Sequence, residues 1–299
     1  MTDHQLNSKK RYLFVINPIA GEVDKSNLSA LLERFASNYN WTTKTYRTSG
    51  NQDKENIESL IESFEPEVVL AAGGDGTVNM VAQLLVDTPI VLGIIPAGSG
   101  NGFSKDLHLP QNNFCAALDC LVHGYIKPID TLEANGHFFL HLADVGFNAH
   151  IVKLFNKGGS RGLLSYARYV AREFFKYPTD YYKITTDKEN FEGNAFMVTI
   201  ANSNQFGSNL TINPDGKYDD GEFEVIIIKR FPKKEAVKLF FRLITKRIKF
   251  SPHCVTIKCS KATISCEKKK TLQYDGELGK KTKEIKVKMK PGSLLAIAP

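Results

Sequence analysis

Apolar and polar residues are arranged along the first 128 residues in blocks that predict strands and helices in alternation. Short apolar runs are typical of buried strands, and apolar residues that recur every three or four positions are typical of helices with one buried face. The predicted strands span 11–17, 41–47, 68–72 and 90–95, and the predicted helices lie near 28–35, 57–64, 78–85 and 114–121. Strict alternation favours a parallel sheet covered on both faces, so we expect an α/β domain over residues 1–128.

Strand-like runs dominate the chain from residue 129 to residue 292. They lie at 129–133, 138–142, 181–186, 195–201, 223–229, 255–259 and 285–289. Turn pairs such as Asn135-Gly136 and Asp220-Gly221 separate several of these runs. Two helical stretches, 163–175 and 233–247, interrupt the pattern. We therefore expect a second domain built on an antiparallel sheet or a sandwich.

The predicted helix at 233–247 is both amphipathic and basic. One face carries Val237, Phe240, Phe241 and Ile244, and another carries Lys234, Lys238, Arg242 and Lys246. A helix of this type can lie on an anionic membrane surface. It can also pack its apolar face into the protein and leave its basic face in solvent, and the sequence favours this ordinary arrangement.

Composition narrows the choice of partner and compartment. The net charge of +7 favours an anionic partner, which is a nucleotide, a nucleic acid or an acidic lipid surface. Five cysteines without a C-x-x-C pair are typical of a reduced, cytoplasmic protein. No apolar run approaches the roughly 18 residues of a membrane-spanning helix, so contact with the inner face of the membrane would be peripheral. No aromatic-basic motif of a nucleic-acid module is present, and we expect no nucleic-acid partner.

Three segments that leave predicted strands contain glycine: 17–21, 73–79 and 96–102. In a parallel sheet such segments lie outside the carboxyl ends of the strands, where ligands bind. Glycine lets backbone N–H groups approach an anion closely, and a helix start favours negative charge. Asp75 adds a carboxylate that can hold Mg²⁺ beside a phosphate. The pattern predicts a phosphate site, although it lacks the Gly-Lys-Ser/Thr of a P-loop and the glycine spacing of a dinucleotide fingerprint.

Several motifs follow one another in a fixed order along the chain. They are Asn17-Pro18-x-Ala20-Gly21, Gly73-Gly74-Asp75-Gly76-Thr77 with Asn79, Pro96-Ala97-Gly98-Ser99-Gly100-Asn101, Asp220-Gly221-x-Phe223 and Tyr274-Asp275-Gly276-Glu277. Each motif is weak alone, but together they resemble the diacylglycerol kinase catalytic-domain family of bacterial lipid kinases and of diacylglycerol, sphingosine and ceramide kinases. The resemblance covers nearly the whole chain.

This resemblance has consequences for the domains. It implies a nucleotide-binding α/β domain over 1–128, similar to that of phosphofructokinases and NAD kinases. It also implies an antiparallel β-sandwich over 129–292 that takes the lipid substrate. The closing strand, 293–299, is expected to return to the first domain.

Residue roles are implied by the resemblance as well. The expected nucleotide contacts are Asn17, Pro18, Gly21, Thr48, Gly73, Gly74, Asp75, Gly76, Thr77, Asn79, Ser99 and Asn101. Asp75 is expected to act through Mg²⁺ on the phosphates of ATP. Asp275 and Glu277 match the family's catalytic acidic pair, one of which takes the proton of the lipid hydroxyl. A structural Mg²⁺ is expected at Asp220, with backbone oxygens of Lys217 and Glu222.

One position departs from most diacylglycerol kinases of the family, because Gly102 stands where they carry Asp. The Gly98-Ser99-Gly100-Asn101 form is similar to that of sphingosine kinases. We expect an ATP- and Mg²⁺-dependent kinase of a lipid hydroxyl, with diacylglycerol or a related glycerolipid as the first acceptor and a sphingoid base as the second. An NAD kinase-like enzyme and a non-catalytic nucleotide-binding regulator are the alternatives. The oligomeric state stays open, a dimer included.

Overall fold

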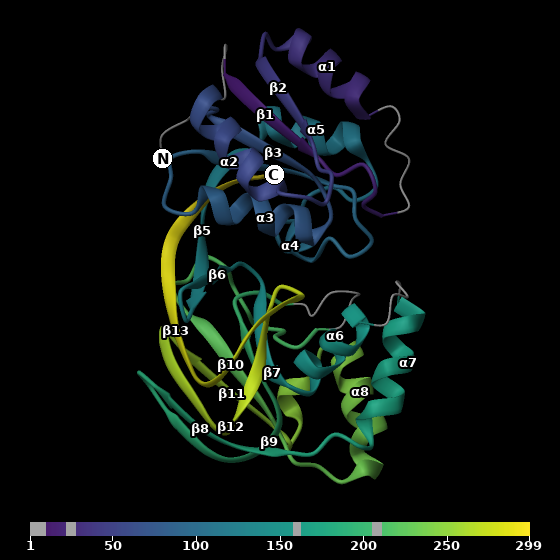
Figure 1. Cartoon of the computed structure of the whole chain (residues 1–299), viewed down its shortest axis with the longest axis vertical. Helices are drawn as coiled ribbons and strands as arrows, with labels where there is room; N and C mark the ends of the chain where they lie inside the picture. The colour runs from purple at the N-terminus through teal and green to yellow at the C-terminus, as the bar shows by residue number, and fades with distance from the viewer. Residues whose placement is uncertain (1–9, 22–27, 158–162, 205–210) are drawn as a thin grey trace. The chain divides into compact units, whose positions relative to one another are not determined.

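The computed structural model describes residues 10–21, 28–157, 163–204 and 211–299, and the chain divides into two compact units (Figure 1). The first unit contains Met1–Ile129 and Gly292–Pro299, and the second contains Asp130–Pro291. Each unit has a hydrophobic core of its own, which is what independent domains require.

A parallel sheet forms the centre of the first unit. In spatial order its strands are β4 (Val91–Pro96), β3 (Val68–Gly73), β1 (Arg11–Ile16) and β2 (Thr42–Arg47). Neighbouring strands run parallel, and the end of β13 (Glu277–Ala298) joins β4 in parallel, with Leu295 opposite Val91. Apolar residues bury β3 and β4 along their whole length, whereas Thr and Lys leave β2 an exposed edge. The expected parallel α/β fold is confirmed.

Helices cover both faces of this sheet (Figure 1). They are α1 (Leu28–Asn38), α2 (Asp53–Phe64), α3 (Asp75–Leu85), the short α4 (Gly102–Asp106) and α5 (Phe114–His123). α1 and α5 share a core with the strands, and α2 and α3 contact each other on the other face. Asn113 fixes the start of α5, because its side chain accepts the amide of Ala116 at 3.0 Å. The sequence pattern misses α4, since its 5 residues are too few to show a helical period.

The glycine-rich motif after β3 enters a helix earlier than its composition predicts. α3 begins at Asp75 with Gly74 as its N-cap, so Gly76, Thr77 and Asn79 lie in the first turns of the helix. The amide of Thr77 already donates to the carbonyl of Gly74 at 3.0 Å. The motif therefore places a helix N-terminus, rather than an extended loop, at the carboxyl end of β3.

Antiparallel strands build the second unit. They are β5 (Tyr125–Ala134), β6 (His137–Phe139), β7 (Leu142–Gly146), β8 (Asp180–Thr186), β9 (Asn190–Ala201), β10 (Phe223–Lys229), β11 (Cys254–Cys259), β12 (Lys261–Tyr274) and β13. The order is β11-β10-β9-β7-β12-β13, and β8 pairs with both β9 and β12. Within β10, Val225 and Ile227 enter one core while Ile226 and Ile228 enter another. The run Val225–Ile228 is apolar at every position because both faces of the strand are buried, and Glu224 beside it is buried as well.

Helices gather on one face of the second unit's sheet (Figure 1). They are α6 (Phe147–Lys157), α7 (Leu163–Phe174) and α8 (Ala236–Ile244), with single turns η1 (Lys233–Glu235) and η2 (Ile248–Phe250) flanking α8. Phe147 and Leu239 pack with Ile226 and Ile228 in their shared core. The pattern predicts α7 and α8 but misses α6, which starts directly after β7 without a connecting turn. No helix in the described part of the chain is long and apolar enough to cross a membrane.

The apolar run at 138–142 forms two strands rather than the predicted single strand. β6 ends at Phe139 and β7 begins at Leu142. Between them, the amides of Leu140 and His141 donate to the carboxylate of Asp275 at 2.9 and 3.1 Å. The strand breaks here because its backbone amides donate to the side chain of Asp275, which lies 135 positions after Leu140 in the chain.

Candidate active site

Three segments lie side by side at the carboxyl ends of β1, β3 and β4. The amide of Asn17, directly after β1, donates to the carbonyl of Ala72 on β3 at 2.9 Å. The amide of Ala97, directly after β4, donates to the carbonyl of Gly73 at 2.9 Å. Backbone hydrogen bonds therefore join the glycine-containing segments at the edge where parallel α/β sheets bind ligands.

Glycine is required in these segments because their backbones touch. A Cβ on Gly74 would lie 3.2 Å from the Cα of Gly98, and a Cβ on Gly98 would overlap the Cα of Gly74. Gly21 has a φ of +63°, and a Cβ there would lie 2.5 Å from the carbonyl oxygen of Ala97. These glycines let the segments pack against one another, so they shape the site before they touch any ligand.

Gly76 differs from Gly21, Gly74 and Gly98 because it faces open space. It is exposed in the first turn of α3, and a Cβ on it would meet no described atom within 4 Å. The first N–H groups of a helix have no intrahelical acceptors, and the helix dipole favours an anion beside them. A phosphate can approach the start of α3 at Gly76 without displacing a side chain.

The carboxylate of Asp75 lies at this same helix start. Its Oδ1 accepts the amide of Phe103 at 3.4 Å, and its Oδ2 would be 2.9 Å from a Cβ on Gly100. Magnesium in kinases is usually held by one or two carboxylates together with the substrate phosphates. One carboxylate beside a helix start that is open to a phosphate therefore fits the donor set of Mg²⁺ bound with ATP.

Polar side chains brace the segments around Asp75. Asn17 Nδ2 donates to Thr77 Oγ1 at 3.1 Å, and Asn101 Oδ1 accepts the amide of Gly98 at 2.9 Å. Of the other candidates, Pro18 and Ser99 are exposed, Asn79 is buried, and Thr48 follows β2 with its amide bonded to the carbonyl of Ile16. Some residues that the sequence predicts to contact the nucleotide thus hydrogen-bond to neighbouring segments, whereas others are exposed to solvent.

In the second unit, Asp275-Gly276 forms the turn between β12 and β13. Asp275 has a φ of 45° and Gly276 a φ of 90°, as a two-residue hairpin turn of the primed type requires. Tyr274 and Glu277 form the last pair of the ladder, and Glu277 is exposed. The two acidic residues are therefore two positions apart on one rigid turn.

Asp275 and Glu277 have different surroundings. Asp275 accepts the amides of Leu140, His141 and Leu142 at 2.9, 3.1 and 2.9 Å. Burial raises the pKa of Asp275, while the charge of His141 and the three N–H groups act in the opposite direction. The carboxylate of Asp275 anchors the turn to the β6–β7 segment, and the side chain of Glu277 projects into solvent.

A buried chain of polar groups supports the same turn from inside the sheet. Gln273 Oε1 accepts the amide of Gly276 at 2.6 Å, and Gln273 Nε2 donates to Asp144 Oδ2 at 2.7 Å across the β12–β7 pair. Asn148 also donates to Asp144 Oδ2, and it accepts the hydroxyl proton of Tyr166. The turn is thus linked to α6 and α7 through side chains under the helices.

Sequence reasoning missed Asp144. It is fully buried, and its Oδ1 has no hydrogen-bond partner among the described residues. Burial raises the pKa of Asp144 to about 6, against the hydrogen bonds from Gln273, Asn148 and the amide of Ala149. A single Asp within the apolar run Leu142-Ala143-Asp144-Val145 was the available signal, because an acidic residue there must be buried.

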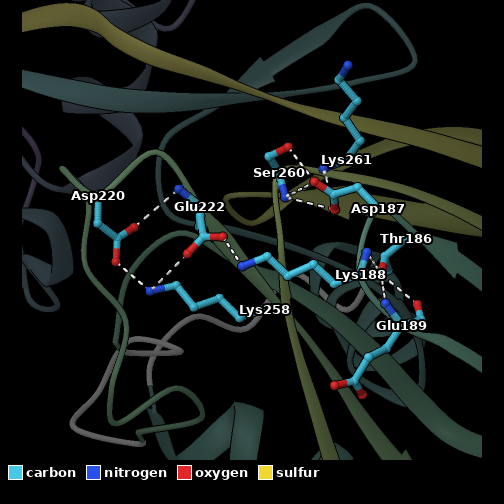
Figure 2. A network of polar contacts seen from close by, with 9 residues as sticks. All are labelled: Thr186, Asp187, Lys188, Glu189, Asp220, Glu222, Lys258, Ser260 and Lys261. Carbon is cyan, nitrogen blue, oxygen red and sulfur yellow. Dashed lines mark hydrogen bonds and ion pairs between the residues drawn. The ribbon is translucent and has the colours of Figure 1, made fainter.

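The turn around Asp220 holds the expected structural metal residues, and Figure 2 shows its polar network. Asp220 Oδ2 lies 2.7 Å from Lys258 Nζ, and its Oδ1 accepts the amide of Glu222 at 3.2 Å. The side chain of Glu222 pairs with Lys188 and lies 3.5 Å from Lys258. Among the described residues, no group of three or more His, Cys, Asp or Glu side chains is placed to hold a metal ion. A cation bound by Asp220 would have to compete with Lys258.

Two family descriptions match the chain. The diacylglycerol kinase catalytic domain matches residues 11–134, and the YegS C-terminal NAD kinase beta sandwich-like domain matches residues 142–298. A diacylglycerol kinase of Bacillus subtilis (strain 168) is 27% identical over 279 residues, which cover 90% of each chain. A diacylglycerol kinase of Staphylococcus saprophyticus is 30% identical over 231 residues, which cover 74% of each chain. These matches confirm the resemblance and the β-sandwich.

Solved structures show the same fold. The crystal structure of a diacylglycerol kinase from Bacillus anthracis str. Sterne matches with a TM-score of 0.76 at 22% identity, over 97% of both chains. Another Bacillus anthracis str. Sterne structure reaches a TM-score of 0.80 at 24% identity and the same coverage. With two matching domains and a relative at 30% identity, the chain belongs to the diacylglycerol kinase catalytic-domain family of lipid kinases.

Proposed function

We propose that this lipid kinase transfers the γ-phosphate of ATP to a hydroxyl of diacylglycerol or a related glycerolipid, with a sphingoid base as the second acceptor. The observation that carries the proposal is the meeting of three glycine-containing segments at the start of α3, where Gly76 faces open space. Phosphoryl transfer needs mainly positioning and neutralisation of phosphate charge, which backbone N–H groups supply. The names of the relatives support diacylglycerol as the acceptor.

In this proposal the first unit, Met1–Ile129 with Gly292–Pro299, holds the nucleotide. The N–H groups at the start of α3 bind its phosphates, and Asn17, Thr77 and Asn101 keep the surrounding segments in place. Bound Mg²⁺ would neutralise charge on the β- and γ-phosphates, with Asp75 as its protein ligand. Pro18, Thr48 and Ser99 are left to contact the rest of the nucleotide.

The second unit, Asp130–Pro291, takes the lipid and supplies the base. We assign the base to Glu277, because its side chain is exposed while the carboxylate of Asp275 is occupied by three backbone amides. Glu277 takes the proton of the attacking hydroxyl, and Asp275 holds the turn that presents it. Asp220 with the backbone of Lys217 and Glu222 is the proposed second metal site, and a cation there would have to replace Lys258 as the partner of Asp220.

Phosphate transfer from labelled ATP tests the proposal. Diacylglycerol, monoacylglycerol, sphingosine, ceramide and NAD are offered in parallel with Mg²⁺. We expect label in a glycerolipid, and a loss of about 10²-fold or more in kcat for Glu277→Gln. Glu284→Gln on the same strand is the matched control, since the side chain of Glu284 is exposed and its one ion pair among the described residues is with Lys286. Label in NAD alone would contradict the lipid acceptor, and nucleotide binding without transfer would favour the regulator.

The location follows from the acceptor. We propose a cytoplasmic protein that contacts the inner face of the membrane peripherally, because its substrate is a membrane lipid. Fractionation of cells by centrifugation, with and without high salt, checks this. A protein that stays in the membrane fraction through high-salt and carbonate washes would contradict a peripheral contact.

A further inference from the structure

Helix α8 carries an exposed apolar face. The exposed fractions are 79% for Val237, 54% for Phe240, 64% for Phe241 and 49% for Ile244. These positions follow i, i+3, i+4 and i+7, so they form one face of the helix. The sequence favoured packing of this face into the protein, and the structure contradicts that expectation.

A different side of α8 attaches the helix to the second unit. Leu239 is buried and Leu243 is half-buried, and both pack in the core that contains Ile226 and Ile248. The buried side of the helix therefore holds it in place, and most of its outer face stays in contact with solvent. Large exposed apolar patches on soluble proteins usually mark interaction surfaces.

Two neighbouring rings extend this outer face. Phe250 on η2 is 67% exposed, and Phe175 after α7 is 55% exposed. Arg242 Nη1 donates to the carbonyl of Phe250 at 2.9 Å, which fixes η2 beside α8. We call the six residues Val237, Phe240, Phe241, Ile244, Phe250 and Phe175 the outer patch.

Cations surround the outer patch. They are Lys233, Lys234, Lys238, Lys246, Arg247 and Lys249, all exposed. Lys233 Nζ lies 5.6 Å from the ring centre of Phe175, and Lys249 Nζ lies 5.4 Å from that of Phe250. Among the described residues, the acidic side chains near the patch include Glu235, 3.9 Å from Lys238, Asp215, paired with Lys249, and Glu173, paired with Arg172. The surface is therefore apolar at its centre and positively charged at its margin.

We propose that the outer patch docks onto an anionic lipid surface. The rings of Phe240 and Phe241 would enter the boundary between head groups and acyl chains, and the lysines at the margin would contact lipid phosphates. Lysine stems can lie along the apolar surface while their ammonium groups stay in water. The biological role of this docking rests on the proposed function, because a kinase of membrane lipids must reach the bilayer.

A second copy of the chain is a poorer occupant for the outer patch. A symmetric contact would place the patch against itself, and the lysines at both margins would then face each other. An anionic bilayer complements both the apolar centre and the positive margin. Charge complementarity thus selects the lipid surface.

Vesicle co-sedimentation of the full chain tests the proposal. The vesicles contain phosphatidylcholine alone or with phosphatidylglycerol, and they contain no acceptor lipid and no ATP. We expect binding at least about tenfold stronger to the anionic vesicles, because each lysine near the surface strengthens binding to anionic lipid several-fold. Equal binding to both vesicles, or binding to neither, would overturn the proposal.

Two double variants separate the apolar and the charged contributions. Phe240→Ser with Phe241→Ser should weaken vesicle binding by at least about tenfold, since each buried ring is worth roughly that factor. Lys234→Gln with Lys238→Gln should weaken binding to anionic vesicles about tenfold and reduce its salt dependence. The matched controls are Tyr125→Ser, an exposed ring elsewhere, and Lys268→Gln with Lys269→Gln on β12. Their binding should equal that of the unchanged protein.

Other outcomes remain distinguishable. Sedimentation velocity without vesicles measures self-association of the variant with Phe240→Ser and Phe241→Ser. If this variant loses self-association but keeps vesicle binding, the occupant of the outer patch is a second copy of the chain, and the proposal is overturned. Phosphate transfer to a short-chain acceptor in detergent should be unchanged in that variant. Vesicle binding without any phosphate transfer would contradict the proposed function and leave the lipid-docking surface intact.

Discussion

In the first unit, backbone groups of glycine-containing segments form the candidate site. In the second unit, acidic side chains form it, and backbone amides far away in the sequence hold one of them in place. Around α3, glycines bring three strand ends into contact, and a Cβ on Gly98 would overlap Gly74. At the β12–β13 turn, Asp275 depends on amides more than 130 positions earlier in the chain. The first arrangement tolerates no added atom where its glycine backbones touch, and the second tolerates little change in charge or hydrogen bonding.

This difference also decides which measurement reports on which unit. The chain has one tryptophan, Trp41, which stacks on Tyr12 in the first unit with ring centres 4.0 Å apart. Its fluorescence therefore follows unfolding of the first unit. Amide hydrogen exchange in β7 and β12 follows the second unit. Each prediction below can thus be assigned to one region.

The largest effect is expected for Gly98→Ala. The new methyl group would overlap the Cα of Gly74, and a backbone atom cannot move aside as a flexible side chain can. Overpacking usually destabilises by about 1–3 kcal/mol, and we expect the upper end of this range where backbone atoms overlap. Urea unfolding followed by Trp41 fluorescence should show the loss, together with weaker ATP binding. Exchange in β7 and β12 should not change, and a change there would contradict the separation of the two regions.

The pH dependence of stability should belong to the second unit. Burial raises the pKa of Asp144 from 3.8 to about 6 and that of Glu224 from 4.5 to about 7. Both groups bind protons more tightly in the folded chain, so the stability that they contribute is fully present below about pH 4 and is lost as the pH rises through about 6 to 7. For Asp144 the shift corresponds to at most about 3 kcal/mol.

Hydrogen exchange between pH 4 and pH 8, corrected for its intrinsic rate, measures this decline in β7 and β12. Asp144→Asn keeps the shape of the side chain and removes its titration, so the decline should become smaller. Glu224→Gln is the matched variant for the second buried carboxyl group. A decline of unchanged size in both variants would show that other groups cause it.

A smaller loss is expected for Asp275→Asn. The new amide can accept with only one atom, so at least one of the N–H groups of Leu140, His141 and Leu142 loses its acceptor. An unsatisfied buried donor destabilises by about 1–3 kcal/mol. Exchange should accelerate at 140–142, and kcat should fall because the turn moves. Glu277→Gln should lower kcat without faster exchange, and equal exchange in both variants would contradict the anchoring role of Asp275.

The same contrast explains what could be predicted from the sequence. The alternation of strands and helices gave the parallel sheet, because local periodicity determines those elements. The break between β6 and β7 was not visible, since it depends on Asp275. β12 was missed because Lys268, Lys269 and Lys270 conceal a strand whose apolar residues lie on either side of them. The direction of the α8 apolar face was also wrong, because periodicity shows that a face exists but not what covers it.

The candidate site follows the same division. Motifs identified Gly73, Gly74 and Gly76 from sequence, but only the structure separates glycines that pack from the one that faces open space. Asp275 and Glu277 look alike in the motif, yet their hydrogen bonding differs. The roles of these residues in nucleotide binding and catalysis remain predictions for the variants described here.

The smallest change in stability, and the sharpest test of the backbone site, is expected for Gly76→Ala. A Cβ at this position meets no described atom within 4 Å, and alanine favours the helix over glycine by about 0.5–1 kcal/mol. Trp41 fluorescence should therefore report equal or slightly higher stability. ATP binding measured by calorimetry should weaken about tenfold or more, because the methyl group occupies the space through which a phosphate approaches the N–H groups of α3. Gly98→Ala loses stability and binding together, whereas Gly76→Ala should lose binding alone. Unchanged ATP affinity in Gly76→Ala would mean that the nucleotide does not contact the start of α3.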